Sequence, residues 1–253
     1  MCHGGDGAKL RRMPPFVIGH ATAAGEAPAN TLAGVRAALA AGCEAMEIDV
    51  QLAADGVPVL LHDTTLDRTT NLRGPVRDVP SAELARADAG SGEHVPTLAE
   101  VLALVGGRLS VFCELKATPG DADQDARLVE GVLAAIDAAG AAAWCGIHSF
   151  DAVIVERARA AQPRLSAAII SVPVDGEGAE RLFAAVLKRG AQAISLHHTA
   201  IDAALVRAAK RRQLTVWTWT VDTEADWAKV IAAGVDGIIT NVPHALRAYL
   251  ARG

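Results

Sequence analysis

Aromatic residues are scarce in this chain: one Tyr, four Phe and four Trp make up 4% of its 253 residues. Apolar residues still account for 51%, so a core must be built mainly from Ala, Val, Leu and Ile. A chain of this length can bury a large core and needs neither disulfides nor a structural metal to fold. The composition therefore excludes a disordered protein and a disulfide-dependent scaffold.

Cysteine is also rare, with four residues at Cys2, Cys43, Cys113 and Cys145. None belongs to a Cys-x-x-Cys pair, and the last three lie in apolar runs, where cysteine acts as a small hydrophobic residue. This usage favours a reducing compartment.

Positive charge is not in excess, since 24 Lys and Arg face 29 Asp and Glu for a net charge of −5. This balance excludes an electrostatic nucleic-acid-binding surface. No run approaches the roughly 18 apolar residues of a membrane helix, and residues 1–15 contain no apolar stretch of the kind a signal peptide needs. We expect a cytoplasmic protein that acts on a small molecule; a homodimer is compatible with the sequence, which locates no interface.

Short apolar runs alternate with Ala-rich helical stretches along the chain. The runs predict eight strands, at 16–19, 45–52, 109–115, 144–150, 166–171, 193–196, 214–221 and 237–240. Helical patterns lie at about 30–41, 97–105, 125–139, 151–162, 179–189, 201–212, 223–233 and 243–251. Continuously apolar strands are typical of a parallel sheet, and eight strand–helix units close a barrel. The sequence predicts an α/β fold, a TIM (β/α)8 barrel, as a single domain over residues 1–253.

One segment interrupts this alternation, at roughly residues 57–95. Its first five residues resemble another strand, and the rest is polar with turn signals at Asn71, Gly74, Pro75 and Pro80. We predict a small insertion between the second strand and its helix, forming a lobe over the barrel mouth.

The active site of such a barrel lies where strands end and the following loops begin. The polar and aromatic residues at the predicted strand ends are His20, Glu47, Asp49, His62, Glu114, Lys116, Trp217, Trp219 and Asn241. Residues two apart in a strand, such as Glu47 and Asp49, project to the same face. We therefore expect these side chains to converge.

Three converging carboxylates are costly to bury without a cation. A hard divalent ion with oxygen ligands, Mg²⁺ or Ca²⁺, resolves the cost, whereas soft ligands for zinc or copper are absent. Two histidines beside such an ion are suited to general acid and base catalysis, and the Lys116 ammonium to charge stabilisation at a phosphoryl centre.

Each residue alone also has a structural interpretation. Glu47 or Asp49 could form an ion pair inside the barrel, and Glu114 a local salt bridge with Lys116. A lone His20 or His62 is more often an ordinary loop histidine. Of the two tryptophans in the seventh strand, we expect one in the core and one at the site. Three further histidines near strand ends have no partner in the sequence and are expected to be structural: His148, His197 and His198.

Several motifs resemble the glycerophosphodiester phosphodiesterases, a family of phosphodiesterase barrels akin to phosphatidylinositol-specific phospholipase C. They are Gly-His at 19–20, Asn-Thr-Leu at 30–32, Glu-Ile-Asp-Val at 47–50, Asp-Gly-Val-Pro-Val at 55–59, His-Asp at 62–63 and Leu-Asp-Arg-Thr-Thr at 66–70. Further matches follow at 88–90, 96–98, 114–116, 149–151, 219–222 and 234–240. The resemblance covers nearly the whole chain in the right order.

The resemblance implies a TIM barrel with an insertion after the second strand. It implies hydrolysis of glycerophosphodiesters to glycerol 3-phosphate and an alcohol with Mg²⁺ or Ca²⁺, in which the substrate's own glycerol hydroxyl can attack and form a cyclic intermediate. The roles that it implies are metal ligands for Glu47, Asp49 and Glu114, an acid/base pair for His20 and His62, a phosphate-side cation for Lys116 and a pocket wall for Trp219.

Four residues depart from the family pattern. Ala21 and Thr22 replace Arg-Gly after His20, Ala29 replaces a Glu before Asn30, and Asn241 stands where many members carry Asp. A phosphate-binding Arg and an acidic partner are thus missing together. Two alternatives stay open beside the main interpretation. One is the same barrel acting on a different phosphodiester, sugar-containing or cyclised in the manner of a phospholipase D. The other is a barrel that binds a phosphodiester without catalysis.

Overall fold

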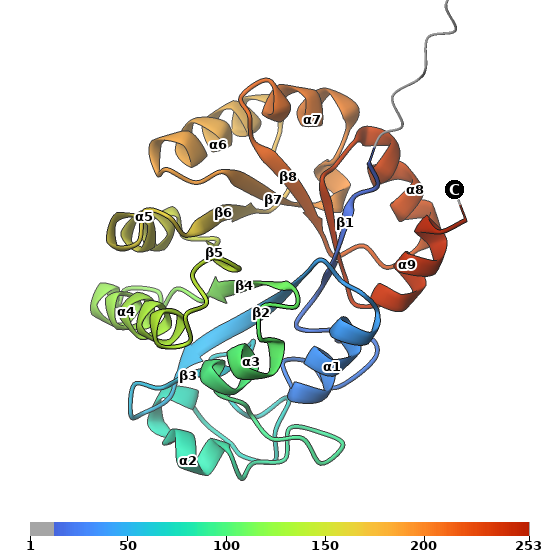
Figure 1. Ribbon diagram of the computed structural model, residues 1–253. Coiled ribbons are helices and arrows are strands. Elements are labelled where there is room, and N and C mark those ends of the chain that lie inside the picture. The colour runs from blue at the N-terminus through green and yellow to red at the C-terminus, as the bar shows by residue number, and fades with distance from the viewer. Residues whose placement is uncertain (1–12, 253) are drawn as a thin grey trace, which may run out of the picture.

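The computed structural model describes residues 13–252; Cys2 and residues 1–12 of the segment searched for a signal peptide lie outside this range. Within it, eight parallel strands form a closed barrel surrounded by helices (Figure 1). The strands are β1 (Phe16–Gly19), β2 (Ala45–Leu52), β4 (Ser110–Leu115), β5 (Cys145–Ser149), β6 (Ser166–Ser171), β7 (Ala193–His197), β8 (Thr215–Trp219) and β9 (Gly237–Thr240). Because β1 pairs with both β2 and β9, the sheet closes and the predicted TIM barrel is confirmed.

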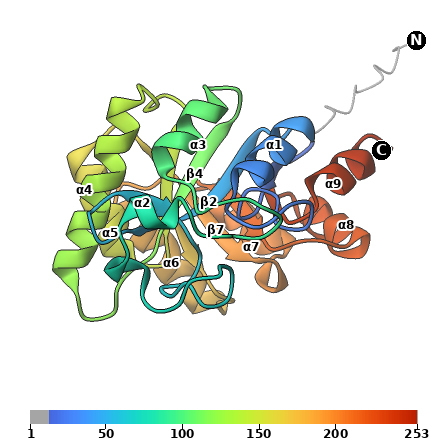
Figure 2. The ribbon, with the colours of Figure 1, turned by 90° about the horizontal axis from the view of Figure 1, so that it is seen from below.

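A helix follows each barrel strand. The helices are α1 (Leu32–Ala40), α3 (Leu98–Val105), α4 (Ala122–Ala138), α5 (Ala152–Ala161), α6 (Gly176–Lys188), α7 (Ala203–Lys210), α8 (Glu224–Ala233) and α9 (Pro243–Leu250), with a 3-10 turn η2 (His198–Ala200) before α7. Seen from below, α4 and α8 lie at opposite sides of the barrel (Figure 2). In the described part of the chain, no helix is long and apolar enough to cross a membrane.

Side-chain caps mark where several of the helices begin. Thr97 and Glu100 form a capping box at the start of α3, and Asp151 caps α5. Each such cap satisfies backbone N–H groups that the helix itself leaves free. These caps fix where the loops before α3 and α5 end.

The insertion after β2 is present. It contains β3 (Pro58–Leu60), which pairs antiparallel with β2, then the 3-10 turn η1 (Val76–Asp78) and the short helix α2 (Ser81–Leu84). A separate small core holds it together, built from Ala53, Val59, Leu61, Leu66, Val76, Leu84, Ala87 and Val95. In Figure 1 the insertion lies beside α3 on the outer side of β2. Its contribution to the site is one wall, where His62 and Arg68 border a cavity shared with the barrel.

The lower part of the barrel interior is filled by large aromatic rings. Phe112 and Trp217 pack with ring centroids 4.3 Å apart. A Cβ on Gly146 would lie 2.7 Å from the Phe112 ring, and one on Gly237 would lie 2.8 Å from Trp217. Because real Cβ contacts are not that short, glycine at these two positions makes room for the rings.

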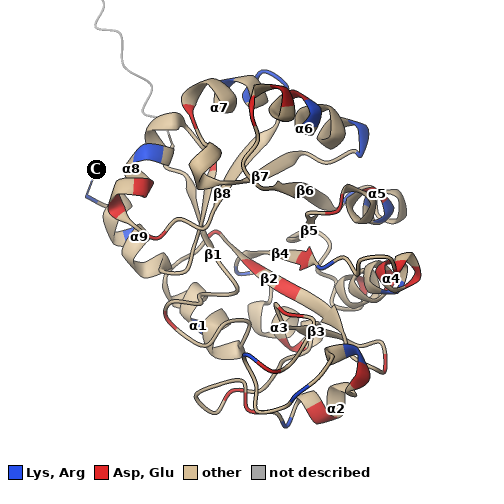
Figure 3. Ribbon diagram, turned by 180° about the vertical axis from the view of Figure 1, so that it is seen from behind, with Lys and Arg blue, Asp and Glu red and all other residues tan. Residues whose placement is uncertain are grey.

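This packed layer determines where polar side chains can lie. Inward positions recur every second residue, so Ala45 in the apolar layer is followed on the same face by Glu47 and then Asp49. On the neighbouring strand Phe112 is followed by Glu114. Figure 3 shows acidic segments in red on β2 and at β4. The carboxylates therefore lie above the apolar layer, at the carboxyl ends of the strands.

Candidate active site

A cavity of about 140 Å³ opens at the carboxyl ends of the barrel strands. Six of the residues singled out in the sequence line it: His20, Glu47, His62, Glu114, Lys116 and Trp219. A second cavity of about 310 Å³ adjoins it and shares His20 and His62. A larger hollow of about 690 Å³ beside α8 and α9 is mostly apolar and carries no carboxylate, so it is not a centre of comparable chemistry.

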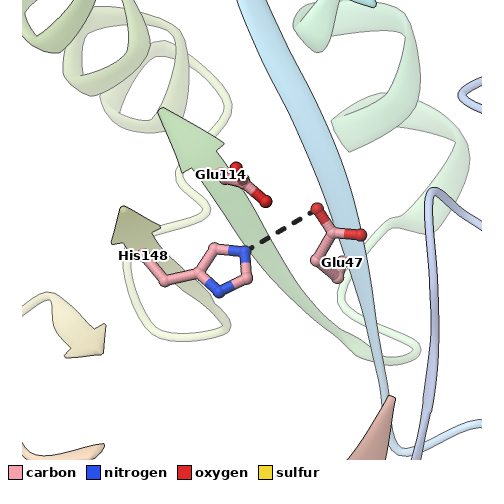
Figure 4. Close-up of side chains that lie close together, drawn as sticks. All are labelled: Glu47, Glu114 and His148. Atoms are coloured by element: carbon pink, nitrogen blue, oxygen red, sulfur yellow. Dashed lines mark ion pairs between the residues drawn. The ribbon is translucent and has the colours of Figure 1, made fainter. Parts of the chain in front are cut away.

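Glu47, Glu114 and His148 point toward one another from β2, β4 and β5 (Figure 4). One ligand atom from each lies within 4.8 Å of the others, and all three residues are buried. His148 Nε2 is 3.7 Å from Glu47 Oε1. Among the described residues, neither Glu47 Oε1 nor either ring nitrogen of His148 has a hydrogen-bond partner. Buried polar atoms without partners are costly, and a cation between them would remove that cost, so these residues fit a metal ion.

Asp49 lies on the same face of β2 but is held elsewhere. Its Oδ2 accepts a hydrogen bond of 2.7 Å from Asn30 Nδ2, and its Oδ1 is 2.7 Å from Lys116 Nζ. Lys116 also contacts Glu114 Oε1, at 2.5 Å. The structure therefore brings two of the three predicted metal ligands together and places the third in an ion pair.

The charges at this site do not balance. The three carboxylates carry three negative charges and Lys116 one positive charge, which leaves −2 when the histidines are neutral. Burial raises the pKa of Glu114, and the Glu47 carboxylate raises it further. Burial also favours the neutral form of Glu47, but the neighbouring His148 and His20 lower its net pKa to about 2. A divalent cation has the charge that this group needs.

His20 is held by an amide at the end of β9. Asn241 Nδ2 donates a 2.6 Å hydrogen bond to Asp222, so its Oδ1 faces His20 Nδ1 at 2.7 Å and can only accept. The proton of neutral His20 is therefore on Nδ1, and Nε2 is left free, 4.0 Å from Glu47 Oε2. Burial lowers the pKa of His20, but Glu47, the Asn241 hydrogen bond and further carboxylates outweigh it and raise the net pKa.

His62 is held by a carboxylate of the insertion. Its Nδ1 lies 2.7 Å from Asp63 Oδ1, and Arg68 binds the same carboxylate through Nε at 2.5 Å and Nη2 at 2.9 Å. The Arg68 hydrogen bonds hold the pKa of Asp63 well below its usual range. His62 thus also presents Nε2 to its surroundings, from a more exposed position than His20.

The two tryptophans of β8 have separate places. Trp217 is buried in the apolar layer against Phe112. Trp219 lines the cavity, donates from Nε1 to Ser195 O at 3.0 Å, and packs edge-on against Phe150 and His197. One tryptophan therefore lies in the core and the other at the cavity, as expected.

The loop after β1 holds Glu47 despite its unusual residues. Ala21 N–H donates a 2.8 Å hydrogen bond to Glu47 Oε2, and Thr22 N–H one of 2.9 Å to Glu47 O. Both residues have positive φ, 43° and 75°, a region that costs non-glycine residues about 1–2 kcal/mol each. Ala21 and Ala29 line the cavity of about 310 Å³, which their small side chains leave open.

His148, expected from the sequence to be structural, instead faces Glu47 and Glu114 in the cavity. The signal was its place at the carboxyl end of β5, where it pairs in register with Glu114 on β4. That register cannot be read from one sequence. Sequence reasoning missed Asp222 as the partner of Asn241. It also missed Ser195, a buried residue of the cavity lining whose hydroxyl has no hydrogen-bond partner within residues 13–252. His197 and His198 lie at the end of β7, outside the Glu47, Glu114 and His148 group.

Comparison with known proteins gives consistent results. The model of the glycerophosphoryl diester phosphodiesterase family matches residues 20–245. A glycerophosphodiester phosphodiesterase of Caldanaerobacter subterraneus is 31% identical over 253 residues, which cover 95% of this chain and all of the relative. An Oleispira antarctica phosphodiesterase, solved in complex with the product sn-glycerol-3-phosphate, has a TM-score of 0.84 and 26% identity, over 94% of this chain and 97% of that one.

A glycerophosphodiester phosphodiesterase from Agrobacterium tumefaciens has a TM-score of 0.77 and 26% identity, over 92% of this chain and 99% of that one. These likenesses run along nearly the full length of each protein and include the strands that carry the site. This chain therefore belongs to the glycerophosphoryl diester phosphodiesterase family.

Proposed function

We propose that this enzyme hydrolyses glycerophosphodiesters to glycerol 3-phosphate and an alcohol with the help of a divalent cation. One observation carries the proposal: a buried Glu47, Glu114 and His148 group, fit for a cation, lies in the same cavity as His20 and His62. The Oleispira relative, which holds glycerol 3-phosphate as its product, supports the substrate class.

Glu47 and Glu114 would hold the cation, with His148 beside them. When bound, the cation supplies Lewis-acid stabilisation of the negative charge on the phosphoryl oxygens. The sequence predicts Asp49 as a further ligand. To bind the cation, Asp49 Oδ1 would have to give up its ion pair with Lys116. The carboxylate oxygens alone favour Mg²⁺ or Ca²⁺.

The two histidines would move the protons. One takes the proton of the attacking hydroxyl, from water or from the substrate's own glycerol, as the oxygen bonds to phosphorus. The other gives its proton to the leaving alkoxide as the phosphorus–oxygen bond breaks. When the glycerol hydroxyl attacks, the first product is a cyclic phosphate, and a water molecule must then add to phosphorus and open the ring to give glycerol 3-phosphate. Both present Nε2 because an oxygen holds Nδ1 in each case, Asn241 for His20 and Asp63 for His62.

Lys116 and Trp219 would bind the substrate. Lys116 is buried between two carboxylates, whose charges outweigh burial and raise its pKa, so it stays an ammonium beside the phosphoryl group. Trp219 offers an apolar wall from β8, which lies across the barrel from β4. Together they would position the phosphorus between the histidines.

A second substrate class is favoured by the cavity of about 310 Å³ next to the histidines. Ala21 and Ala29 leave space in this cavity at the two positions where the family usually has Arg and Glu. A phosphodiester with a bulkier substituent, such as a sugar, would fit there. The histidines and carboxylates argue against a barrel that only binds.

The test is product release from glycerophosphocholine, glycerophosphoethanolamine, glycerophosphoinositol and a sugar-containing phosphodiester. Each is measured with chelator and after cation add-back. We expect cation-dependent glycerol 3-phosphate. A cyclic phosphate or another phosphomonoester would favour the second class instead. No product from any of them, with the cation bound, would overturn the proposal.

The histidine roles are tested separately. His20→Ala and His62→Ala should each lower kcat by roughly 10²–10⁴-fold if the two are acid and base. His244→Ala, a histidine at the start of α9 outside the cavity, is the matched control and should leave kcat unchanged. A loss under threefold for both cavity histidines would contradict the assignment.

A further inference from the structure

His148 is a buried imidazole whose two nitrogens have no protein partner among residues 13–252. It lies at the carboxyl end of β5, in register with Glu114 and facing Glu47 (Figure 4). We propose that His148 is a direct ligand of the catalytic cation and makes the site favour Co²⁺ or Zn²⁺ over Mg²⁺ and Ca²⁺. This inference rests on the proposed cation site and specifies the kind of ion it takes.

The geometry distinguishes His148 from the paired histidines of the same chain. His62 lies 2.7 Å from Asp63, and His94 Nε2 lies 3.1 Å from Glu100 Oε1. At 3.7 Å, His148 Nε2 is beyond hydrogen-bond distance of Glu47 Oε1, although both atoms are buried and neither has another partner in the described part of the chain. A histidine that served only as a counter-ion would lie within hydrogen-bond distance of the Glu47 carboxylate. A cation bound by both His148 Nε2 and Glu47 Oε1 needs the larger separation between these two atoms.

The chemistry of the three donors sets the preference. Two carboxylates alone would suit a hard ion such as Mg²⁺ or Ca²⁺. Imidazole nitrogen is a borderline ligand, and sites that contain it bind first-row transition metals and zinc more tightly. Three protein ligands also leave coordination positions open, as in catalytic metal sites. His148 is therefore the residue on which the choice of ion depends.

Metal binding tests this directly. The chelator-treated protein is titrated by calorimetry with Co²⁺, Zn²⁺, Mg²⁺ and Ca²⁺, and so are His148→Gln and His94→Gln. We expect His148→Gln to raise the Kd for Co²⁺ and Zn²⁺ at least about tenfold, since loss of even an outer partner of a ligand costs 10–100-fold. The Kd for Mg²⁺ and Ca²⁺ should change less than about threefold, because a glutamine oxygen still suits a hard ion.

His94→Gln is the matched control, because it also removes an imidazole next to a glutamate but leaves no cluster of three ligands. It should leave every Kd unchanged. Equal weakening of all four ions by His148→Gln, or no change for Co²⁺ and Zn²⁺, would overturn the proposal.

A second measurement needs no variant and so does not depend on its folding. Mn²⁺ bound to the wild-type protein should show nitrogen hyperfine coupling in pulsed electron paramagnetic resonance. Its absence in a 1:1 complex would mean that His148 is not a ligand. The hydrolysis assay separates the two proposals: glycerol 3-phosphate release without nitrogen coupling rejects only this inference, whereas nitrogen coupling without hydrolysis of any substrate rejects only the proposed function.

Discussion

Two histidines at the mouth of the barrel show how a single neighbouring oxygen can set the reactive atom of an imidazole. His20 donates from Nδ1 to a neutral amide, Asn241, and His62 donates to a carboxylate, Asp63. In both cases Nε2 is the free nitrogen. Asn241 itself is oriented by Asp222, which accepts from its Nδ2. The proton on His20 is therefore controlled by a residue that does not contact the ring.

We expect Asn241→Ala to lower kcat about tenfold or more, because the His20 ring loses the acceptor that fixes its tautomer. Asn241→Asp should not restore the activity, since the new carboxylate would face Asp222 at the 2.6 Å contact that the amide now makes. The measurement is kcat against pH for both variants. An unchanged pH profile and rate in Asn241→Ala would show that His20 does not need this hydrogen bond.

Substitutions at Ala21 test whether the side chain at this position determines affinity for the phosphate. Ala21→Arg alone should not help, because the guanidinium would enter a buried position without an acidic partner. The double change with Ala29→Glu restores a pair at the cavity of about 310 Å³ and should lower KM for a glycerophosphodiester. The two single variants are the controls. An unchanged KM in the double variant would mean that the site serves a different substrate.

At the scale of elements, the apolar layer inside the barrel supports the site and sets the position of the strands that carry it. The Phe112 and Trp217 rings fill the interior below the carboxylates, and Gly146 on β5 leaves room for Phe112. His148 is the next inward position on the same strand. A shift of β5 would therefore move a proposed metal ligand together with the apolar layer.

Gly146→Ala should destabilise the protein by about 1–3 kcal/mol, the usual cost of overpacking, because the added Cβ would lie 2.7 Å from the Phe112 ring. Phe112→Leu in the same chain should restore part of that loss. Gly176→Ala is the control, since nothing lies within 4 Å of its Cβ at the start of α6. Urea unfolding measures all four proteins. Equal stability of Gly146→Ala and Gly176→Ala would show that the strand adjusts freely.

At the scale of the whole molecule, the eight strands and the insertion were predictable because apolar runs and turn residues are local signals. The convergence of His20, Glu47, His62, Glu114 and Lys116 followed from where strands end. Two features did not follow. The pairing of His148 with Glu114 depends on strand register, and the ion pair of Asp49 with Lys116 depends on side-chain geometry. Both arise from contacts between strands, which no local pattern records.

Stability of the whole barrel should report on the cation. Without it, Glu47 and Glu114 face each other as buried like charges, so binding should raise Tm. A ligand at 100 times its Kd stabilises by about 2.7 kcal/mol, which for a chain of this size is a shift of roughly 5–10 °C. Chelator treatment should lower Tm by that amount and add-back should restore it.

The variant Glu114→Gln tests whether the stabilising cation binds at Glu114. The amide removes the repulsion but can still accept a hydrogen bond from Lys116, so the chelator-treated variant should be at least as stable as the chelator-treated wild type. It should also lose most of the cation-dependent rise in Tm, because a charged ligand is gone. Glu130→Gln, on the exposed face of α4, is the matched control and should keep the full rise. A cation-dependent rise in Tm as large in Glu114→Gln as in the wild type would show that Glu114 is not a ligand and that the cation binds elsewhere.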